Sequence, residues 1–372
     1  MINDVRTWVE IDTKAAKRNY TVLRRLLKPE CQLMAVVKSN AYGHDLIPFS
    51  KLLEKFGADW LGIDSLVEAL ALRTKNVRKP ILVLGYTLPH RFAEAAKHKV
   101  SLTISTLENL KALKNSPVKF HLKIDTGMHR QGFLPKDMPR VLRELKRWPE
   151  AKNYFEGIYT HFAAAKNPAF PQDTKKQIAE FKKVLALVEA NGFKPLRHAA
   201  ATASTMLFPE THLDMVRLGI GLYGLWPAKE VAAAFSSQLE LKPVLSWKTI
   251  ISEIKKLPAL SRVGYDLTET LVNPSTIAIC PIGYWHGYPR ALSSIGHVLI
   301  GGGVAKVVGR VSMDIIIIDV TGIKNPRVGD EVVILGRKGA TEISADYLAY
   351  LTDTSPYEII ARLNPLMKRV YR

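Results

Sequence analysis

The sequence predicts a (β/α)8 barrel of the TIM type, followed by a mostly β C-terminal domain. Eight short apolar runs rich in β-branched residues are each followed by a stretch with helical spacing, which is typical of such a barrel. After about residue 237 the pattern changes to short strands separated by Gly, Pro and Asn. A chain of 372 residues also exceeds the size at which a single core stops growing. We therefore expect two domains, residues 1–237 and residues 238–372.

The predicted elements follow from this periodicity. Barrel strands are expected at Leu33–Lys38, Asp59–Ile63, Ile81–Gly85, Ser101–Ser105, Val118–Asp125, Phe155–His161, Leu196–Ala201 and Asp214–Leu218. Helices are expected at Thr13–Leu27, Ser65–Lys75, Arg91–Lys99 and Gln172–Asn191. C-terminal strands are expected at Val244–Glu253, Thr276–Pro281, His297–Ile300, Ala305–Val311, Ile315–Val320 and Glu331–Leu335.

The chain is strongly basic, with 53 Lys and Arg residues against 34 Asp and Glu residues and a formal net charge of +19. Such a balance can mark a protein that binds nucleic acid. The basic residues are dispersed as short pairs such as Lys175-Lys176, however, and aromatic residues do not interleave with them to stack on bases. We therefore expect no nucleic-acid partner.

The cysteine content and the apolar runs indicate the compartment. Cys31 and Cys280 lie far apart in the sequence and predict neither a disulfide framework nor a metal site. No stretch approaches the roughly 20 apolar residues of a membrane span, and the N-terminus lacks the pattern of a secretory signal. These features favour a cytoplasmic protein without a membrane partner.

The segment LMAVVKSNAYGHD, residues Leu33 to Asp45, places a lysine where an apolar strand ends. Active sites of such barrels lie at the carboxyl ends of the strands, so the position of Lys38 favours chemistry. Two interpretations remain open from this position alone. The lysine could extend its ammonium group from the strand end into solvent, or, if desolvated, it could act as a free amine that forms a Schiff base with an aldehyde cofactor.

The string AVVKSNAYGHD closely resembles the pyridoxal-phosphate lysine motif of the alanine racemase family. The resemblance continues, in family order, in HLKIDTGMHRQGF, GIYTHFA, MVRLGIGLYG, RVGYDLTET, IGYWHGYPR, VGRVSMD and SPYEIIARL. These motifs cover nearly the whole chain. The resemblance implies a racemase that interconverts L- and D-alanine for peptidoglycan, with pyridoxal 5'-phosphate as cofactor and no metal. It also implies a homodimer in which the β-rich domain contributes to the partner's active site.

Racemisation at Cα requires one group that removes a proton and another that returns one to the opposite face. By resemblance, these two bases are Lys38, which also carries the cofactor, and Tyr265. Arg217 resembles the arginine that faces the pyridine nitrogen, and His161 resembles the residue that orients this arginine. A permanently protonated arginine would keep the ring nitrogen unprotonated and make the cofactor a weaker electron sink.

The resemblance assigns the remaining site residues to two groups. The cofactor group contains the phosphate-binding positions and an apolar wall beside the ring, which are Tyr42, Thr202, Gly219, Ile220, Gly221, Tyr357 and Leu84. The substrate group contains Arg130, Tyr284 and Met313. Lys123 matches a lysine that is carbamylated in some members of the family.

The sequence departs from the family's pattern at several positions. Ala201 stands where an asparagine is usual, and Ser312 stands where a cysteine often precedes Met-Asp. Lys166 and His286 replace acidic residues of the substrate entryway, and Trp285 lies beside His286. We therefore expect a more basic and narrower entryway, which leaves the substrate less certain than the reaction.

Three alternative functions remain. A racemase for serine or another small amino acid would use the same residues. An amino-acid decarboxylase of the same architecture would need an acidic partner for the pyridine nitrogen, where this sequence has Arg217. A non-catalytic pyridoxal-phosphate carrier would need only the barrel, so residues 238–372 argue against it.

Overall fold

The computed structural model describes residues 4–372, which form two compact units. The barrel unit contains Ala16–Ala41 and Leu46–Lys242. The β-rich unit contains Tyr42–Asp45, Pro243–Arg372 and the N-terminal segment that ends at Ala15. This division differs from the predicted one, because the sequence analysis assigned the whole N-terminal segment to the barrel.

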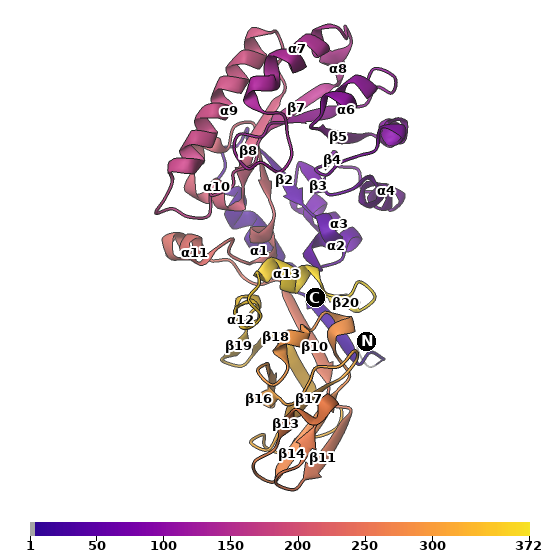
Figure 1. Cartoon of the computed structure of the whole chain (residues 1–372), viewed down its shortest axis with the longest axis vertical. Helices are drawn as coiled ribbons and strands as arrows, with labels where there is room; N and C mark the ends of the chain where they lie inside the picture. The colour runs from indigo at the N-terminus through magenta and orange to yellow at the C-terminus, as the bar shows by residue number, and fades with distance from the viewer. Residues whose placement is uncertain (1–3) are drawn as a thin grey trace. The chain divides into compact units, whose positions relative to one another are not determined.

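Eight parallel strands close into the predicted barrel (Figure 1). They follow one another around it in chain order, as β2 (Gln32–Val36), β3 (Trp60–Ile63), β4 (Ile81–Val83), β5 (Val100–Ile104), β6 (Phe120–Lys123), β7 (Phe155–Tyr159), β8 (Leu196–Ala201) and β9 (Met215–Leu218). Most of their residues are buried, because a barrel strand is covered on both faces. The predicted fold class is therefore confirmed.

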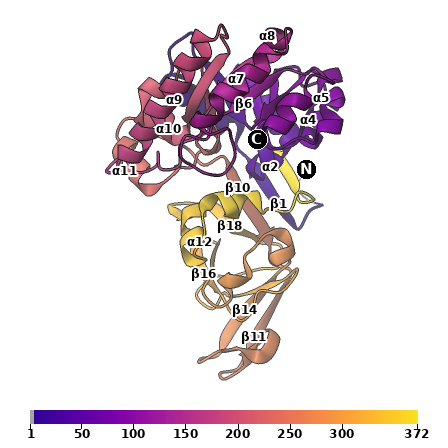
Figure 2. The ribbon, with the colours of Figure 1, turned by 45° about the horizontal axis from the view of Figure 1, so that its top comes forward.

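Helices surround the barrel strands on the outside (Figures 1 and 2). The α-helices that precede, separate or follow the barrel strands in the sequence are α1 (Thr13–Arg24), α2 (Lys38–Tyr42), α3 (Leu46–Phe56), α4 (Leu66–Thr74), α5 (Phe92–Lys97), α6 (Leu107–Ala112), α7 (Met138–Lys146), α8 (Ala151–Tyr154), α9 (Gln172–Ala190), α10 (Thr202–Leu207) and α11 (Lys229–Phe235). The local sequence determines where several of these helices begin. Ser65 and Thr106, for example, cap α4 and α6 by accepting hydrogen bonds from backbone N–H groups three residues on.

Bulky apolar side chains fill the inside of the barrel. Met34, Trp60, Leu82 and Met215 form one buried cluster, and each comes from a different strand. Leu84 packs against this cluster from the carboxyl end of β4. Burying one such side chain contributes roughly 1.5–3 kcal/mol, so the cluster makes the barrel a packed core rather than a pore.

The β-rich unit is built on one large sheet. Its strands are β1 (Thr7–Ile11), β10 (Leu245–Ile250), β11 (Glu253–Leu257), β14 (Ser275–Cys280), β15 (His297–Ile300), β16 (Gly303–Val307), β17 (Ile316–Asp319), β18 (Glu331–Lys338), β19 (Thr341–Ile343) and β20 (Lys368–Tyr371). A separate hairpin pairs β12 (Arg262–Val263) with β13 (Glu269–Thr270), and two helices, α12 (Ala345–Leu351) and α13 (Pro356–Ala361), lie between β19 and β20 in the sequence.

The N-terminal strand β1 explains the revised division. It pairs antiparallel with β10 and parallel with β20, so the N-terminal segment and the C-terminus of the chain lie side by side in one sheet. The sequence analysis did not predict β1 or β20. Both are short, and neither shows a clear alternation of apolar and polar residues.

The predicted strand Val244–Glu253 corresponds to β10 (Leu245–Ile250) but extends too far toward the C-terminus, because Glu253 already begins a second strand, β11. β10 pairs with β1 and β18, whereas β11 pairs with β14. The break falls at Ile251 and Ser252, where the backbone N–H of Ile251 donates to Asp330 O and that of Ser252 donates to Ile279 O. The chain therefore changes partners within one apolar run, which a single sequence does not reveal.

Gly43 offers a test of packing within the β-rich unit. It has a φ of +84°, and a Cβ built on it would lie 2.0 Å from the carbonyl oxygen of Ile360. Gly302 has the same φ of +84° but has nothing within 4 Å of such a Cβ. Gly302→Ala should therefore lower the free energy of unfolding by only about 1 kcal/mol, and Gly43→Ala by about 2–4 kcal/mol. Urea unfolding of both variants measures the difference, and equal losses would contradict the packing described here.

Candidate active site

The predicted site residues of the barrel unit gather at the carboxyl ends of its strands. Lys38 follows β2, Leu84 follows β4, Lys123 ends β6, Arg130 lies in the loop after β6, His161 follows β7, Thr202 follows β8, Arg217 lies within β9, and Gly219, Ile220 and Gly221 follow β9. Because parallel barrel strands end on the same side, these side chains share one mouth.

Lys38 begins a turn with left-handed backbone rather than ending a strand. The strand β2 stops at Val36, and the four residues from Ser39 to Tyr42 have φ angles between 50° and 56°. Such a conformation costs roughly 1–2 kcal/mol per residue, so side chains must hold it. Glu68 accepts from the Ser39 N–H at 2.7 Å, and Asn40 accepts from the Leu46 N–H at 2.9 Å.

The Lys38 side chain is partly exposed at this mouth. Its Nζ lies 3.8 Å from Oδ1 of Asp64, which follows β3. Asp64 in turn donates its backbone N–H to Glu68, the same carboxylate that holds the Lys38 turn. Two carboxylates therefore position the amine and the backbone that carries it.

Arg217 is a buried cation, with only 4% of its surface exposed. Its Nη2 donates to the carbonyl oxygens of Thr160 at 2.7 Å and Ala199 at 2.9 Å, and its Nη1 lies 3.0 Å from Nδ1 of His198. The guanidinium also lies 4.9 Å from the centre of the Tyr159 ring. Burial lowers the pKa of Arg217 to about 10, which still leaves the group protonated at neutral pH.

A chain of polar contacts leads from Arg217 through the barrel interior, and we call it the histidine relay: Arg217, His198, His121 and Glu156. The Nε2 of His198 lies 2.8 Å from Nδ1 of His121, and the Nε2 of His121 lies 3.5 Å from Oε2 of Glu156. The last contact is longer than an ordinary hydrogen bond. Three of the four side chains are at most 4% exposed.

The donors in the histidine relay fix the state of both imidazoles. A guanidinium can only donate, so Nδ1 of His198 must accept and its proton must sit on Nε2. That proton faces Nδ1 of His121, which must accept in turn and carry its own proton on Nε2, toward the Glu156 carboxylate. Burial lowers the pKa of both histidines, which agrees with neutral rings.

A glycine makes room for the relay. A Cβ built on Gly157 would lie 2.2 Å from Nδ1 of His121, so any side chain at this position would displace the imidazole. Tyr159, two residues on, stacks on the His198 ring at a centroid distance of 4.7 Å. Its hydroxyl lies 3.0 Å from Oγ1 of Thr103. The relay is thus fixed by packing as well as by hydrogen bonds.

His161 marks the convergence of positive charge at the mouth. Its Nδ1 lies 3.4 Å from Nη2 of Arg217, so this nitrogen accepts. The pKa of His161 is lowered to about 3, mainly by burial and in addition by four cations: Arg217, Arg130, Lys123 and Lys38. The structure thus brings these four predicted residues around one neutral imidazole.

The turn after β9 has the features of an anion cradle. The backbone N–H of Gly219 donates to Oγ1 of Thr202 at 3.1 Å. A Cβ built on Gly221 would lie 2.7 Å from Cγ2 of Thr202, so only glycine leaves this turn open. Ala201 contributes no amide, but Ser204 accepts from its backbone N–H at 2.8 Å and caps α10 in its place.

The loop after β6 is held by a single carboxylate. Asp125 Oδ1 accepts from the N–H groups of Gly127, Met128 and His129, and its Oδ2 accepts from that of Arg130. These bonds outweigh the effect of burial, which would raise the pKa of Asp125, and leave it lowered. The loop thereby fixes the backbone that carries the exposed Arg130 side chain.

Lys123 is buried beside this loop, at 5% exposure, and its Nζ donates to Oε1 of Gln131 at 3.2 Å. Its pKa is lowered to about 8, mainly by burial and in addition by the nearby charge of Arg130. A larger share of this lysine is therefore a free amine than of an exposed lysine.

The β-rich unit carries the other predicted site residues. Tyr265 is 70% exposed and begins a short helical turn after Gly264. That turn lies against the segment before the VSMD motif, since a Cβ on Gly264 would be 3.1 Å from the backbone nitrogen of Arg310. Arg310 also pairs with Asp266 at 3.1 Å. The phenol is therefore presented outward from a well-anchored turn.

Tyr284 and Met313 lie on two segments that are joined through the backbone. The N–H groups of Tyr284 and Trp285 donate to the carbonyl oxygens of Ser312 and Met313, at 3.0 and 2.9 Å. Tyr284, Trp285 and Met313 are between 43% and 56% exposed. With Tyr265 they give this unit an outward aromatic and apolar surface.

His286, which was expected to make the entryway more basic, carries no positive charge of its own. It is buried, its Nδ1 accepts from the Gly283 N–H at 3.2 Å, and burial lowers its pKa. The ring therefore stays neutral at neutral pH and adds no positive charge, although an acidic residue is lost. Of the two neighbouring departures, Trp285 is the one that faces outward.

Tyr42 and Tyr357 form a pair within the β-rich unit. Their ring centres are 6.2 Å apart, and burial raises the pKa of Tyr42 to about 12 and that of Tyr357 higher still. Both hydroxyls therefore remain protonated and can donate to an anion. Tyr357 lies in α13, whose N-terminus is capped by Ser355.

Sequence reasoning missed His198, His121, Glu156 and Asp64. A signal was present for the two histidines, because each is flanked by an apolar residue inside a predicted barrel strand, where a polar side chain needs a partner. Their contact joins β8 to β6, which are not neighbours in the barrel, so no local pattern announces it.

Two further features bear on the chemistry. Within residues 4–372, no group of three or more His, Cys, Asp and Glu side chains is arranged to hold a metal ion. None of the helices in this part of the chain is both long and apolar enough to cross a membrane.

The fold and the residues at the barrel mouth define the class of protein as an amino-acid racemase, an isomerase built from a barrel and a β-rich domain. Comparisons with known proteins agree. The family model for "Alanine racemase, N-terminal domain" matches residues 11–227, and that for "Alanine racemase, C-terminal domain" matches residues 244–371. The chain belongs to the alanine racemase family, as its motifs predicted.

Individual relatives cover the whole length. An alanine racemase of Symbiobacterium thermophilum is 40% identical, over 98% of this chain and 97% of the relative. The solved structure of an alanine racemase from Clostridium difficile 630 has a TM-score of 0.92 at 33% identity and covers 99% of this chain and 96% of its own. A histidine racemase from Leuconostoc mesenteroides has a TM-score of 0.88 at 30% identity, covering 99% and 98%.

Proposed function

We propose that this protein interconverts L- and D-alanine with pyridoxal 5'-phosphate as cofactor, in the cytoplasm, and so supplies D-alanine for peptidoglycan. The observation that carries the proposal is the set of four cations around the neutral His161. Such a mouth suits a ligand that brings a phosphate and a carboxylate. The curated relatives that match the full chain are alanine racemases, which supports the same substrate.

The residues at the mouth fit pyridoxal phosphate. The turn at Gly219, Ile220 and Gly221, with Thr202 behind it, can take the phosphate. The family motifs assign Tyr42 and Tyr357 to the same phosphate, and both keep protonated hydroxyls that can donate to an anion. Leu84 offers an apolar wall. Arg217 offers only N–H donors, so it suits an unprotonated pyridine nitrogen. When bound, this cofactor supplies an aldehyde for Lys38 and a ring that withdraws electrons from the substrate's Cα.

Lys38 and Tyr265 are the two bases in this proposal. The Nζ of Lys38 takes or returns a proton on one face of Cα, and the Oη of Tyr265 does so on the other. Arg217 limits how strongly the ring withdraws electrons, because its two carbonyl partners and His198 hold it as a fixed donor. Rapid return of the proton is thereby favoured over side reactions.

Arg130, Tyr284 and Met313 position the substrate in this proposal. Arg130 supplies a guanidinium for the carboxylate, on the loop that Asp125 fixes. Lys123 steadies Arg130 if its free amine adds carbon dioxide, a step that forms an N–C bond and releases one proton. The lowered pKa of Lys123, about 8, supports this modification because it raises the fraction of free amine.

A racemase for serine, histidine or another amino acid is the second candidate. Lys166 and the exposed Trp285 alter the entryway, and the histidine racemase neighbour shares the fold at 30% identity. Purified protein should be incubated with each common L-amino acid, and the D-enantiomer measured by chiral chromatography. We expect alanine to be turned over fastest and Lys38→Ala to be inactive. Faster turnover of another amino acid would replace alanine as the substrate.

The active site is proposed to be shared in a homodimer, with Lys38 from one chain and Tyr265 from the partner. The outward position of Tyr265, at 70% exposure, supports a role toward another chain. Lys38→Ala and Tyr265→Phe should each be nearly inactive alone. Mixed by subunit exchange, half the dimers would be heterodimers with one intact site of two, so activity should recover to roughly a quarter of wild type. Differential tags confirm the heterodimers, and no recovery in their presence would reject the shared site and leave Tyr265 either acting within its own chain or not catalytic.

A further inference from the structure

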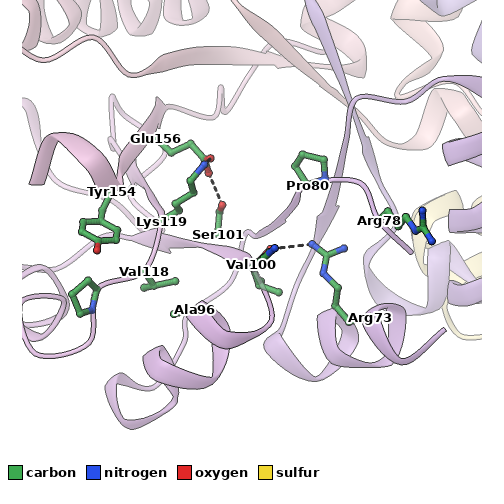
Figure 3. Close-up of a pocket in the computed structure, with 12 residues that line it drawn as sticks. Arg73, Arg78, Pro80, Ala96, Val100, Ser101, Val118, Lys119, Tyr154 and Glu156 are labelled. Atoms are coloured by element: carbon green, nitrogen blue, oxygen red, sulfur yellow. Dashed lines mark hydrogen bonds and ion pairs between the residues drawn. The ribbon is translucent and has the colours of Figure 1, made fainter. Parts of the chain in front are cut away.

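A second cavity lies at the opposite end of the barrel from the proposed active site. Its volume is about 490 Å³, which is within the range of small-molecule sites. It opens where strands begin rather than where they end, since Pro80 precedes β4, Lys99 precedes β5, Lys119 precedes β6 and Tyr154 precedes β7 (Figure 3). No residue of the proposed active site lines it.

The charges that line the cavity are unbalanced. Four cations, Arg73, Arg78, Lys99 and Lys119, face one carboxylate, Glu156. The Arg73 guanidinium donates hydrogen bonds to carbonyl oxygens, including those of His98, Val77, Lys79 and Lys99, which do not cancel its charge. Glu54, nearby, accepts from the backbone N–H groups of Arg78 and Lys79.

Two of these cations are available to a ligand. Within residues 4–372, no carboxylate lies within ion-pair distance of the Arg78 or Lys99 side chains, although Lys119 pairs with Glu156 at 2.7 Å. Figure 3 shows Arg78 at one side of the cavity and Lys119 and Glu156 at the other. A ligand between them would therefore meet the unpaired Arg78 guanidinium at one end and, at the other, the Lys119 ammonium, which it would share with Glu156.

The rest of the wall is apolar and rigid. Pro80, Val100 and Val118 line the cavity between its charged ends. Tyr154, at one edge, stacks on Trp148 with ring centres 5.4 Å apart, and Trp148 stacks on Phe120 of β6. The wall is thus preformed, which lowers the entropy that binding would cost.

The carboxylate of the cavity is also the end of the histidine relay. Glu156 accepts from Lys119 and from the Ser101 hydroxyl, and its Oε2 lies 3.5 Å from His121. An anion that drew Lys119 toward itself would leave Glu156 more negative toward His121. The cavity is therefore in contact with Arg217 through two imidazoles.

We propose that this cavity is a second ligand site, which binds a small multivalent oxyanion and reports its occupancy to Arg217 through the histidine relay. Separated cations require more than one anionic group, and the apolar wall between them accommodates carbon atoms. Phosphates and polycarboxylates share this chemistry. The site goes beyond the proposed function, because its binding step requires neither cofactor nor catalysis.

Calorimetry with pyrophosphate and, separately, with citrate tests the site and distinguishes the two sources. The protein is first loaded with pyridoxal phosphate, so that the cradle at Gly219 cannot take up the probe. Arg78→Ala/Lys99→Ala should weaken binding of the preferred probe at least about tenfold. The control Lys175→Ala/Lys182→Ala removes two exposed lysines of α9 that do not line the cavity, and should change affinity less than about twofold.

The outcomes are distinct. Equal weakening of binding by both double variants would assign the binding to the general positive charge of the protein and overturn the site. The site would also be overturned if neither pyrophosphate nor citrate bound. Because the tested residues lie away from the proposed cofactor cradle, the comparison remains valid even if no cofactor binds. Glu156→Gln should strengthen binding, since it removes the one negative charge that faces the anion; weaker binding would contradict the assignment.

The link to the relay has its own readout. In protein labelled with ¹⁵N at histidine, the probe should shift the imidazole signals of His121 in the wild type and not in Glu156→Gln. Binding without any shift of His121 in the wild type would reject the link and leave the site standing alone.

Discussion

The buried guanidinium of Arg217 is the constraint on which the barrel mouth depends. An unpaired charge in a protein interior is costly, and among residues 4–372 no carboxylate pairs directly with this one. Two carbonyl oxygens and the rings of His198 and His161 stabilise it instead. Each ring must be neutral and must turn an unprotonated nitrogen toward the arginine. Arg217 can therefore keep its place at the barrel mouth only while His198 and His161 remain unprotonated.

This requirement extends through the barrel. Because His198 must accept from Arg217, it can only donate to His121, and the chain of donors ends at the Glu156 carboxylate. Gly157 leaves space for His121, and Tyr159 stacks on His198. The positive charge of Arg217, toward the carboxyl end of the strands, is thus connected to the negative charge of Glu156, near their amino end. Such an arrangement explains why polar residues occupy otherwise apolar strands.

The second constraint is the left-handed turn after Lys38. Its cost is offset at both ends by different parts of the structure: Glu68 holds Ser39 in the barrel unit, while within the β-rich unit Arg369 donates to Gly43 O and Tyr371 donates to His44 O. The chain therefore crosses between its two units directly after the proposed cofactor lysine. A strained segment held in this way keeps its position without relying on the ligand.

How much the sequence predicts depends on whether the cause is local. The eight barrel strands followed from apolar runs, as did the place of Lys38 just beyond the first of them, and the roles proposed for Arg217 and Tyr265 come from family motifs. The partner change between β10 and β11 and the contact between His121 and His198 did not, because both depend on segments distant in sequence. Periodicity records which residues are buried, but not which nitrogen of a buried histidine must carry the proton.

The tautomeric states of His198 and His121 show directly whether Arg217 is held by this chain of hydrogen-bond donors. Long-range ¹H–¹⁵N spectra of histidine-labelled protein, assigned with His121→Gln and His198→Gln, should show both rings neutral with the proton on Nε2. Their pKa values are lowered by burial, so the same signals should persist from about pH 8 to about pH 5.5, through the range in which an exposed histidine gains its second proton. A proton on Nδ1 of His198, or an imidazolium at either position at neutral pH, would contradict the claim that Arg217 is held by a chain of donors.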